Sequence, residues 1–409
     1  MKKAFYAAMM AAALCACGTS GQGGQAVQDD VPDYAAAQKV NTASLQLFYK
    51  VYSAEKGKDN ICVSPASASW ALSMAASGAG SGTAVQLYKA LGFDVADAET
   101  VNRYQQSTIA RLNKHGDDRT TIGIANSMWI NKDFKVKKPF IEDNGQYYNA
   151  AVKNCVFNAD AVAAINRWCS DNTAGRIPEI VKEINPMSQM YLINALYFNS
   201  RWKDVFSKER TKEQTFTKED GTKVKVQMMH ATSRARYYEN DKVQITEKVF
   251  DKGEFSMYFI LPREGVAMDE AAYGLSTGFY AWCDSFSRCD VRLALPRFSA
   301  DYSTSLKAPL QAMGVNDAFT SAADFSGISK DRMRIGDVLQ KTFIKVDEEG
   351  AEAAAVTSVI LEAASAGPPV IKQMTLDRPF FYAICERATG SILFIGKSGH
   401  PEENSGNNH

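Results

Sequence analysis

Histidine, a common catalytic residue, is sparse in this chain of 409 residues, and the residues that could perform catalysis match no common catalytic motif. The four histidines, His115, His230, His400 and His409, form no HExxH pair, and neither a GxSxG motif nor a CxxC pair occurs. The glycine-rich run GAGSGT lacks the lysine and the spacing of a phosphate-binding loop. The sequence therefore predicts no enzyme, no metal site and no cofactor, although a triad of distant Ser, His and Asp residues stays open.

The stretch EEGAEAAAVTSVILEAAS, residues 348–365, is unusual because its conformational preference changes along its length. Its first half is rich in alanine and glutamate and favours a helix, whereas its second half, with Val, Thr and Ile, favours a strand. In a strand with Ala351 facing inward, one face holds no charge and grows from small to bulky residues. That inward face is Ala351, Ala353, Ala355, Thr357, Val359 and Leu361, and the outward face is Glu352, Ala354, Val356, Ser358, Ile360 and Glu362. An amphipathic helix linking two strands is the alternative, but it does not explain a charge-free face of period two.

The elements that must position this stretch are predicted from apolar periodicity, with helices mainly in the first third of the chain and strands after it. Helices are expected at 38–54, within 60–80, at 163–181 and within 290–314, where a strand precedes the helix. Strands are expected at 120–130, 188–202, 222–229, 255–262, 343–350 and within 378–401. No repeat or internal low-complexity linker divides the body, so we expect one large α+β domain.

The first residues of the chain predict export. A positive start, MKK, and a short apolar run are typical of a signal peptide, and the sequence Leu14-Cys15-Ala16-Cys17-Gly18 resembles a bacterial lipobox with Cys17 as the lipidated residue. An ordinary signal peptide cut nearby is the alternative. The lipobox interpretation makes residues 1–17 a lipoprotein signal peptide, 18–37 a flexible tether and 402–409 a disordered tail. Because Gly18 is not an aspartate, we expect a surface-exposed outer-membrane lipoprotein that touches the membrane through its lipid anchor only.

Charge and cysteine content limit the partners. The 46 basic and 46 acidic residues cancel, which gives no reason to expect nucleic acid as a partner, and we expect a monomer. Six cysteines remain after Cys17, and an exported protein can oxidise them. Only Cys283 and Cys289 are close in sequence, and whether they form a bridge stays open.

Seven blocks of the chain, in their order, resemble the serpin family over residues 38–401. They are NICVSPASASWALSMAASGA, NTAGRIPEIV, LINALYFNSRWKDVF, KVKVQMM, LQAMGVNDAFTSAADFSGIS, KVDEEGAEAAA and RPFFYAICERATGSILFIGK. The resemblance implies a serpin fold with three β-sheets, eight or nine helices and an exposed reactive-centre loop at about residues 348–370.

The resemblance also assigns roles to single residues. The hinge of the loop matches Glu348, Glu349, Gly350, Ala351, Ala353, Ala354 and Ala355, and the reactive-site bond falls between Ala364 and Ser365, within one or two residues. The polar cluster called the shutter matches Ser64, Ser67 and Asn194, and Gln340 stands where the family commonly has a histidine. Trp202 matches the breach, the point at the top of the sheet where the loop first enters, although ordinary core packing also explains it.

The function implied is suicide-substrate inhibition, in which a serine protease cleaves the loop and is trapped when the loop inserts into the central sheet. Ala364 suits the shallow specificity pocket of elastase-like or subtilisin-like proteases, and no Lys or Arg lies between Val346 and Ile371 to suit a trypsin-like one. A non-inhibitory serpin, acting as a binding or folding-helper surface lipoprotein, is the alternative. A surface hydrolase and an adhesin with an exposed linker are weaker rivals.

Overall fold

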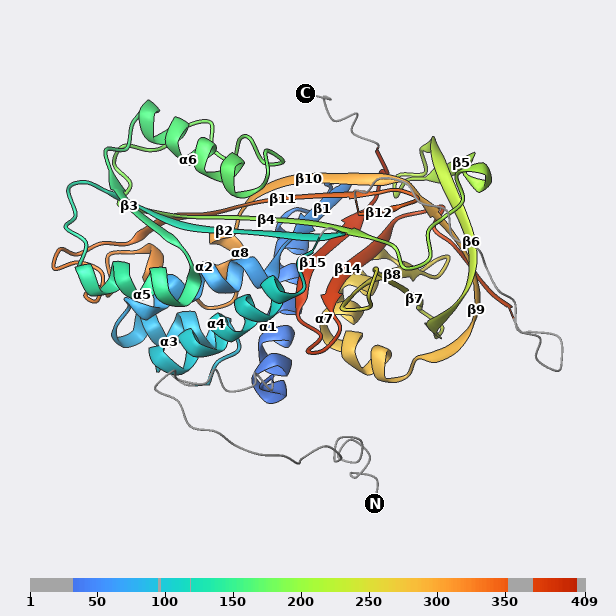
Figure 1. Cartoon of the computed structure of the whole chain (residues 1–409), viewed down its shortest axis with the longest axis horizontal. Helices are drawn as coiled ribbons and strands as arrows, with labels where there is room; N and C mark the ends of the chain where they lie inside the picture. The colour runs from blue at the N-terminus through green and yellow to red at the C-terminus, as the bar shows by residue number, and fades with distance from the viewer. Residues whose placement is uncertain (1–31, 95–96, 118, 352–370, 403–409) are drawn as a thin grey trace, which may run out of the picture. The chain divides into compact units, whose positions relative to one another are not determined.

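The computed structural model describes residues 32–94, 97–117, 119–351 and 371–402, and Figure 1 shows their arrangement. This part of the chain contains eight α-helices and two short 3₁₀ helices. The α-helices are α1 (Tyr34–Ala54), α2 (Pro65–Ser77), α3 (Ser81–Ala90), α4 (Ala98–Lys114), α5 (Lys138–Tyr148), α6 (Ala159–Asn172), α7 (Met268–Asp284) and α8 (Lys307–Ala312), and the 3₁₀ helices are η1 (Lys208–Arg210) and η2 (Asp317–Phe319). The predicted α+β class is confirmed.

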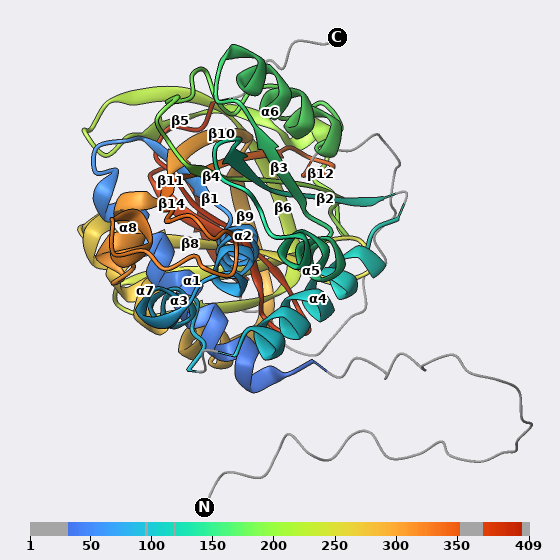
Figure 2. The ribbon, with the colours of Figure 1, turned by 90° about the vertical axis from the view of Figure 1, so that its left-hand side faces the viewer.

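A six-stranded sheet forms the centre of the molecule. Its order is β10 (Phe298–Ser305), β11 (Ile335–Val346), β4 (Met190–Arg201), β2 (Thr120–Asn131) and β3 (Ala151–Cys155), and β12 (Gly350–Ala351) also pairs with β4. The pair β11–β4 is parallel, whereas β10–β11 and β4–β2 are antiparallel. Helices α2 and α6 lie on opposite faces of this sheet (Figures 1 and 2).

A second, nine-stranded sheet runs in the order β1 (Asn60–Val63), β15 (Ile392–Ser398), β14 (Phe380–Glu386), β8 (Phe255–Pro262), β7 (Val243–Val249), β6 (Lys223–Glu239), β9 (Ser287–Pro296) and β13 (Ile371–Thr375), and β5 (Lys212–Thr217) pairs with β6. The prediction of three separate sheets therefore needs correction, because the described strands form two hydrogen-bonded sheets. The reason is β6, which pairs with β5 and β9 along most of its length and with β7 at its end, and so joins two ladders into one.

Helix α2 is the element on which the six-stranded sheet rests. Ser64 caps its first turn by accepting a hydrogen bond from the Ser67 amide, and Pro65 occupies the first helical position. Every residue from Pro65 to Ala76 is buried, and most of them are Ala or Ser. These small side chains let the helix lie against both sheets, since α2 contacts β4 and β2 of one and β15 of the other.

The folded body begins and ends differently from the prediction. Helix α1 starts at Tyr34, and Asp33 caps it by accepting a 2.9 Å hydrogen bond from the Ala36 amide, so residues 34–37 belong to the body and not to a tether. At the other end, the Glu402 carbonyl accepts a 2.8 Å bond from the Ser299 amide, so the predicted tail begins one residue later. Cys17, residues 18–31 and residues 403–409 lie outside the described part.

Two further findings concern the described residues only. Their six cysteines, Cys283 and Cys289 included, are unpaired thiols. No helix among these residues is long and apolar enough to cross a membrane.

Candidate functional site

The parallel seam between β11 and β4 is the central feature of the site. Their register runs from Ile335 opposite Met190 to Phe343 opposite Tyr197, and above that point the two strands no longer pair. There β12 returns and pairs with β4 in the antiparallel sense, with Gly350 opposite Arg201 and Ala351 opposite Ser200. The upper end of the seam is thus already occupied by the first two residues of a strand that could continue downward between β11 and β4.

Close packing holds these two residues against β4. Ala351 is fully buried, so the inward direction assumed for it agrees with its position. At Gly350, a Cβ atom would lie 2.2 Å from the carbonyl oxygen of Ser200, which is closer than any real contact. Only glycine allows the chain to approach β4 at this point.

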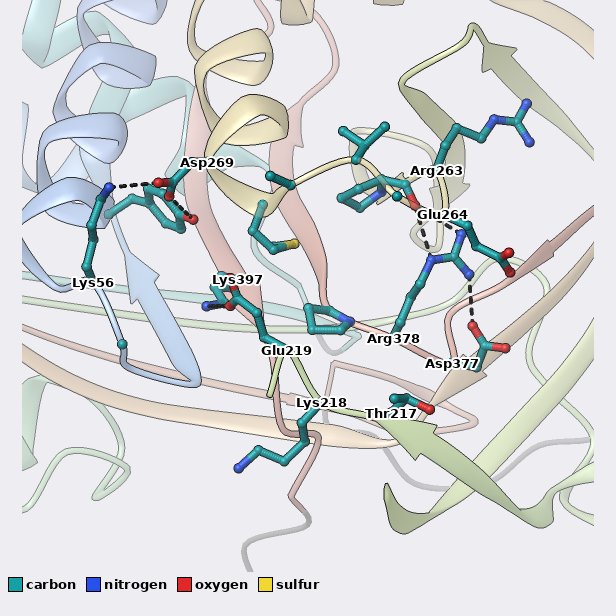
Figure 3. Close-up of a pocket in the computed structure, with 18 of the residues that line it drawn as sticks. Lys56, Thr217, Lys218, Glu219, Arg263, Glu264, Asp269, Asp377, Arg378 and Lys397 are labelled. Atoms are coloured by element: carbon teal, nitrogen blue, oxygen red, sulfur yellow. Dashed lines mark hydrogen bonds and ion pairs between the residues drawn. The ribbon is translucent and has the colours of Figure 1, made fainter. Parts of the chain in front are cut away.

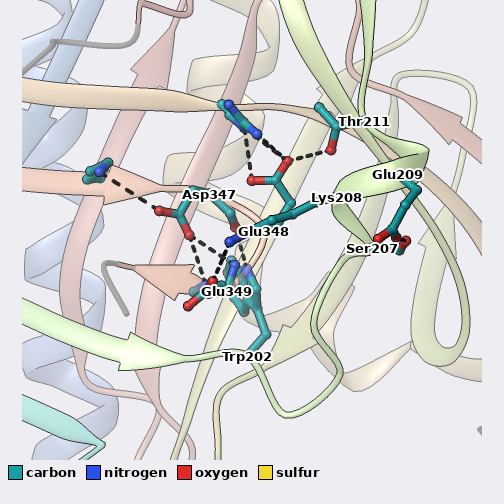
Figure 4. Close-up of polar contacts among 11 residues, drawn as sticks. Trp202, Ser207, Lys208, Glu209, Thr211, Asp347, Glu348 and Glu349 are labelled. Atoms are coloured by element: carbon teal, nitrogen blue, oxygen red, sulfur yellow. Dashed lines mark hydrogen bonds and ion pairs between the residues drawn. The ribbon is translucent and has the colours of Figure 1, made fainter. Parts of the chain in front are cut away.

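Ion pairs hold the two glutamates that precede Gly350 (Figure 4). The Arg297 guanidinium donates to the buried Glu348 carboxylate through Nε to Oε2 at 2.9 Å and Nη2 to Oε1 at 2.7 Å, and the Thr211 hydroxyl also donates to Oε1. Burial raises the pKa of Glu348, but the bonds from Arg297 and Thr211 outweigh burial and leave this pKa below its ordinary value. Lys208 Nζ lies 2.7 Å from Glu349 Oε1. Ion pairs with Arg297 and Lys208 therefore hold Glu348 and Glu349, the first two residues of the hinge, in place.

Trp202, the predicted breach residue, binds the same segment through the backbone. Its amide donates to the Glu349 carbonyl at 2.8 Å, and its indole Nε1 donates to the Asp347 carbonyl at 3.0 Å. Its ring stacks on Phe250 with centroids 4.3 Å apart. Trp202 is therefore both a core residue and a hydrogen-bond donor to the backbone of residues 347–349.

The four predicted shutter residues lie together beneath the seam. Gln340 of β11 accepts a 2.9 Å bond from the Ser64 amide and donates through Nε2 to Asn194 Oδ1 at 2.7 Å. Asn194 of β4 donates to the Ser67 carbonyl at 2.6 Å. Gln340 and Asn194 stand opposite each other in the parallel register, so their side-chain bond crosses the seam itself. An amide at position 340 has no proton to gain or lose near neutral pH, which makes this bond independent of pH.

Several site residues were not predicted. Asn126 of β2 accepts a 2.6 Å bond from Asn194, and a lone asparagine inside the apolar run of 120–130 was a usable signal because buried polar residues need partners. Arg297 follows Pro296 in a loop position, and nothing local marks it as the partner of Glu348.

The residues Ala353, Ala354, Ala355, Ala364 and Ser365 lie outside the described part, and their roles stay predictions.

Removing the Gln340 side chain should loosen the seam. In Gln340→Ala the buried Ser64 amide and Asn194 Oδ1 lose these partners, so we expect the free energy of unfolding to fall by about 3 kcal/mol and the seam to open faster. Urea unfolding followed by tryptophan fluorescence measures the first effect. Thr342→Val is the matched control, since the buried Thr342 lies on the same strand but its hydroxyl binds Cys62 of β1, through the carbonyl at 2.8 Å, and not a residue of β4 across the seam. Equal losses in the two variants would contradict the bridging role of Gln340.

A buried lysine beside Trp202 makes the stability of this region depend on pH. The Lys248 ammonium lies 5.2 Å from the Trp202 ring centroid and 4.3 Å from that of Phe206, and burial lowers the pKa of Lys248 from 10.5 to about 8. Below pH 8 both folded and unfolded states carry the charge, and the folded state bears its full desolvation cost. Between pH 8 and 10.5 only the unfolded state keeps the proton, so the free energy of unfolding from this group rises with pH.

Lys248→Met should therefore stabilise the protein by about 1–3 kcal/mol at pH 7, less than the full shift because the cation–π contacts are lost. The difference between variant and wild type should shrink to almost nothing near pH 10.5, the ordinary lysine value. Urea midpoints of both proteins across this pH range measure it, and the comparison cancels the titration of all other groups. A difference that stays constant with pH would show that desolvation of Lys248 is not the cause.

Comparison with known proteins agrees with this geometry. The family model for serpin (serine protease inhibitor) matches residues 38–401. An uncharacterized serpin-like protein of Methanosarcina acetivorans is 32% identical over 383 residues, covering 91% of this chain and 90% of that protein, and human neuroserpin is 30% identical, covering 86% and 88%. The native structure of the thermophilic serpin tengpin superposes with a TM-score of 0.83 at 34% identity, covering 91% of this chain and 95% of tengpin. Human thyroxine-binding globulin complexed with thyroxine has a TM-score of 0.82 at 28% identity, covering 90% and 99%.

The fold and the seam thus define an α+β protein in which the parallel strands β11 and β4 separate at the end where β12 pairs with β4. The chain belongs to the serpin family. Members of this family are generally protease inhibitors and not enzymes, although some, such as thyroxine-binding globulin, are non-inhibitory.

Proposed function

We propose that this protein is a suicide-substrate inhibitor of elastase-like or subtilisin-like serine proteases. The protease forms an acyl-enzyme at Ala364, releasing Ser365 as the new amino terminus, and the loop then inserts between β11 and β4 before the ester is hydrolysed. The protease is carried with the loop and its active site is distorted, so each inhibitor molecule acts once.

The observation that carries this proposal is the register of β12 on β4. Gly350 stands opposite Arg201, and because the pairing is antiparallel, each residue forward in the loop meets the residue one position earlier in β4. Seven steps on, Thr357 meets Asn194. The inward residues Ala351 to Leu361 then fall opposite Ser200 to Met190 at every second position.

The two faces of β4 match the two faces of the loop. Leu192, Leu196 and Phe198, opposite the inward set, belong to the main hydrophobic core, which suits uncharged residues that become larger with depth. Tyr191, Ile193 and Ala195 belong instead to the smaller core under α6 and would meet Ile360, Ser358 and Val356. This explains why the outward face of the loop contains apolar residues in its middle.

The two outward glutamates fall at the ends of the inserted strand. Glu352 would meet Asn199 and Glu362 would meet Gln189, and both partners are only half buried. Carboxylates there can stay hydrated, whereas a charge in the middle would be buried without a partner. The inserted strand would thus bury uncharged side chains on both faces and leave its two carboxylates in contact with water at its ends.

Insertion has a large driving force. It replaces one parallel ladder by two antiparallel ones, adding on the order of ten backbone hydrogen bonds at about 0.5–1.5 kcal/mol each. Burial of Val359, Leu361 and Ile360 adds several kcal/mol more. The state with the loop uninserted is therefore metastable, and the bonds that Gln340, Arg297 and Trp202 make across or above the seam help to keep it so.

Denaturing gel electrophoresis after mixing the protein with pancreatic or neutrophil elastase tests the proposal. We expect a stable band near the summed masses and a released fragment whose amino-terminal sequence starts at Ser365. Elastase with its catalytic serine replaced by alanine is the control and should give no such band. Cleavage without a stable band would leave either slow insertion or a non-inhibitory binding role, and the melting temperature of the cut protein separates them.

We also propose that Cys17 anchors the inhibitor to the outer surface of a bacterial envelope, supported by the lipobox-like sequence around it. An anchored inhibitor would protect the cell from proteases in its surroundings. Mass spectrometry of the amino-terminal peptide tests this placement, because an unmodified terminus would favour an ordinary signal peptide.

A further inference from the structure

A cleft of about 740 Å³ lies away from the hinge and the shutter. Four segments enclose it: the C-terminal end of α1, the turn between β5 and β6, the loop from β8 to α7, and residues 377–379 before β14 (Figure 3). Its volume is that of a site for a small organic molecule. None of the residues that line it belongs to the predicted hinge, shutter or breach.

A buried cation, Lys397 of β15, lines the cleft. The side chain of Lys397 is 5% exposed, and its ammonium lies 2.7 Å from Glu219 Oε2 and 3.3 Å from the Lys58 carbonyl. Glu219 is 52% exposed and comes from the turn between β5 and β6. The partner of the buried ammonium is thus a carboxylate that water reaches, and another carboxylate can take its place.

The other basic side chains of the cleft are already paired. Lys56 pairs with Asp269 at 2.7 Å, Lys218 pairs with Asp59 at 2.6 Å and Arg263 pairs with Glu239 at 2.7 Å. Arg378 donates to Asp377 at 3.0 Å and to the Pro262 carbonyl. These paired charges give the rim no net attraction for a polyanion. The cleft therefore suits a ligand with one negative charge.

Several apolar side chains line the same cleft as the Lys397 ammonium. Tyr52, Met268, Pro262 and Pro379 line the cleft and are buried, and Val266 is half buried beside them. The Lys397 ammonium lies 5.9 Å from the Tyr52 ring centroid. A hydrocarbon body lying against the part of these side chains that faces the cleft would gain mainly from the removal of its own apolar surface from water.

We propose that this cleft binds a small amphipathic carboxylate, such as a medium-chain fatty acid, whose head group replaces Glu219 on Lys397. The apolar body lies along Tyr52, Met268 and the two prolines. Binding here is independent of protease trapping, because the site shares no lining residue with the hinge or the shutter.

Isothermal titration calorimetry of the full chain with octanoate tests the site. We expect Lys397→Met to weaken octanoate binding by about tenfold or more, because a charge-assisted hydrogen bond is lost while the apolar walls remain. We expect Glu219→Ala to tighten binding by about two- to fivefold, because a competing ion pair of that exposure is removed. This gain keeps the test informative even if Lys397→Met folds poorly.

Two controls isolate the head group. Lys56→Met removes a rim cation that is 62% exposed and already paired, and it should change octanoate affinity less than twofold. Uncharged 1-octanol should bind weakly and equally to wild type and Lys397→Met. No binding of octanoate to wild type at millimolar concentration would overturn the proposal, as would equal affinities in wild type and Lys397→Met or no gain in Glu219→Ala.

Discussion

Thr357→Arg should be cleaved by elastase at the wild-type rate but form almost no stable complex. In the inserted state that we propose, the β12–β4 register continued along the loop puts this side chain opposite Asn194, on the face of the main core. An arginine there is buried without a partner, at a cost of several kcal/mol. Even about 4 kcal/mol in the insertion barrier slows insertion about a thousandfold, so hydrolysis of the acyl-enzyme wins. The number of inhibitor molecules consumed per protease inhibited, measured by titration, should rise by at least about tenfold.

Two variants control for this result. Glu352→Arg introduces the same side chain five residues earlier, but there it faces outward opposite the half-buried Asn199, so trapping should survive. Thr357→Val keeps the size and removes the hydroxyl, and it should also trap. Trapping by Thr357→Arg at the wild-type stoichiometry, or its loss in Glu352→Arg, would mean that the register extended from β12 is wrong.

Cleavage of the loop should raise the stability of the wild-type protein by about 10 kcal/mol or more, since a full central strand is added to the six-stranded sheet. A gain of this size is comparable with the whole stability of an ordinary domain. The urea midpoint, followed by the fluorescence of Trp202 and the other tryptophans, should move to much higher urea after limited proteolysis by a protease that is not trapped.

The Thr357→Arg variant is the matched control for this measurement as well. Its loop is cut at the same bond, but the inserted strand then carries the several kcal/mol cost of a buried, unpaired arginine, so its midpoint should rise less. A cut wild-type protein with an unchanged midpoint would sink the inhibitory mechanism and favour a binding role. A large rise without a stable protease complex would keep the mechanism of insertion and show that this protease hydrolyses the ester too fast.

Much of the fold could be predicted from the sequence because the relevant signals are local. The Ser64-Pro65 cap and the apolar runs of β4 and β8 each depend on neighbours along the chain. The structure confirms this helix and these strands, and the family match confirms the serpin fold. The period-two pattern of 348–365 is equally local, but beyond Ala351 it lies outside the described residues and stays a prediction. Local signals failed at boundaries: α1 begins four residues before Gln38, where alanines without an apolar stripe gave no periodicity to detect.

The sequence by itself determined the family and the α+β class, because composition, apolar periodicity and short blocks of residues are recognised without knowledge of neighbours in space. That the loop can become a strand stays a prediction. The tertiary structure alone decided that β6 joins two expected sheets into one and that Arg297 holds Glu348 from 51 residues away. It also paired Gly350 with Arg201, and it buried Lys397 beneath an exposed glutamate. These are pairings between distant segments. Which strand or charge meets which depends on the register and packing of the whole chain, and no local pattern encodes that choice.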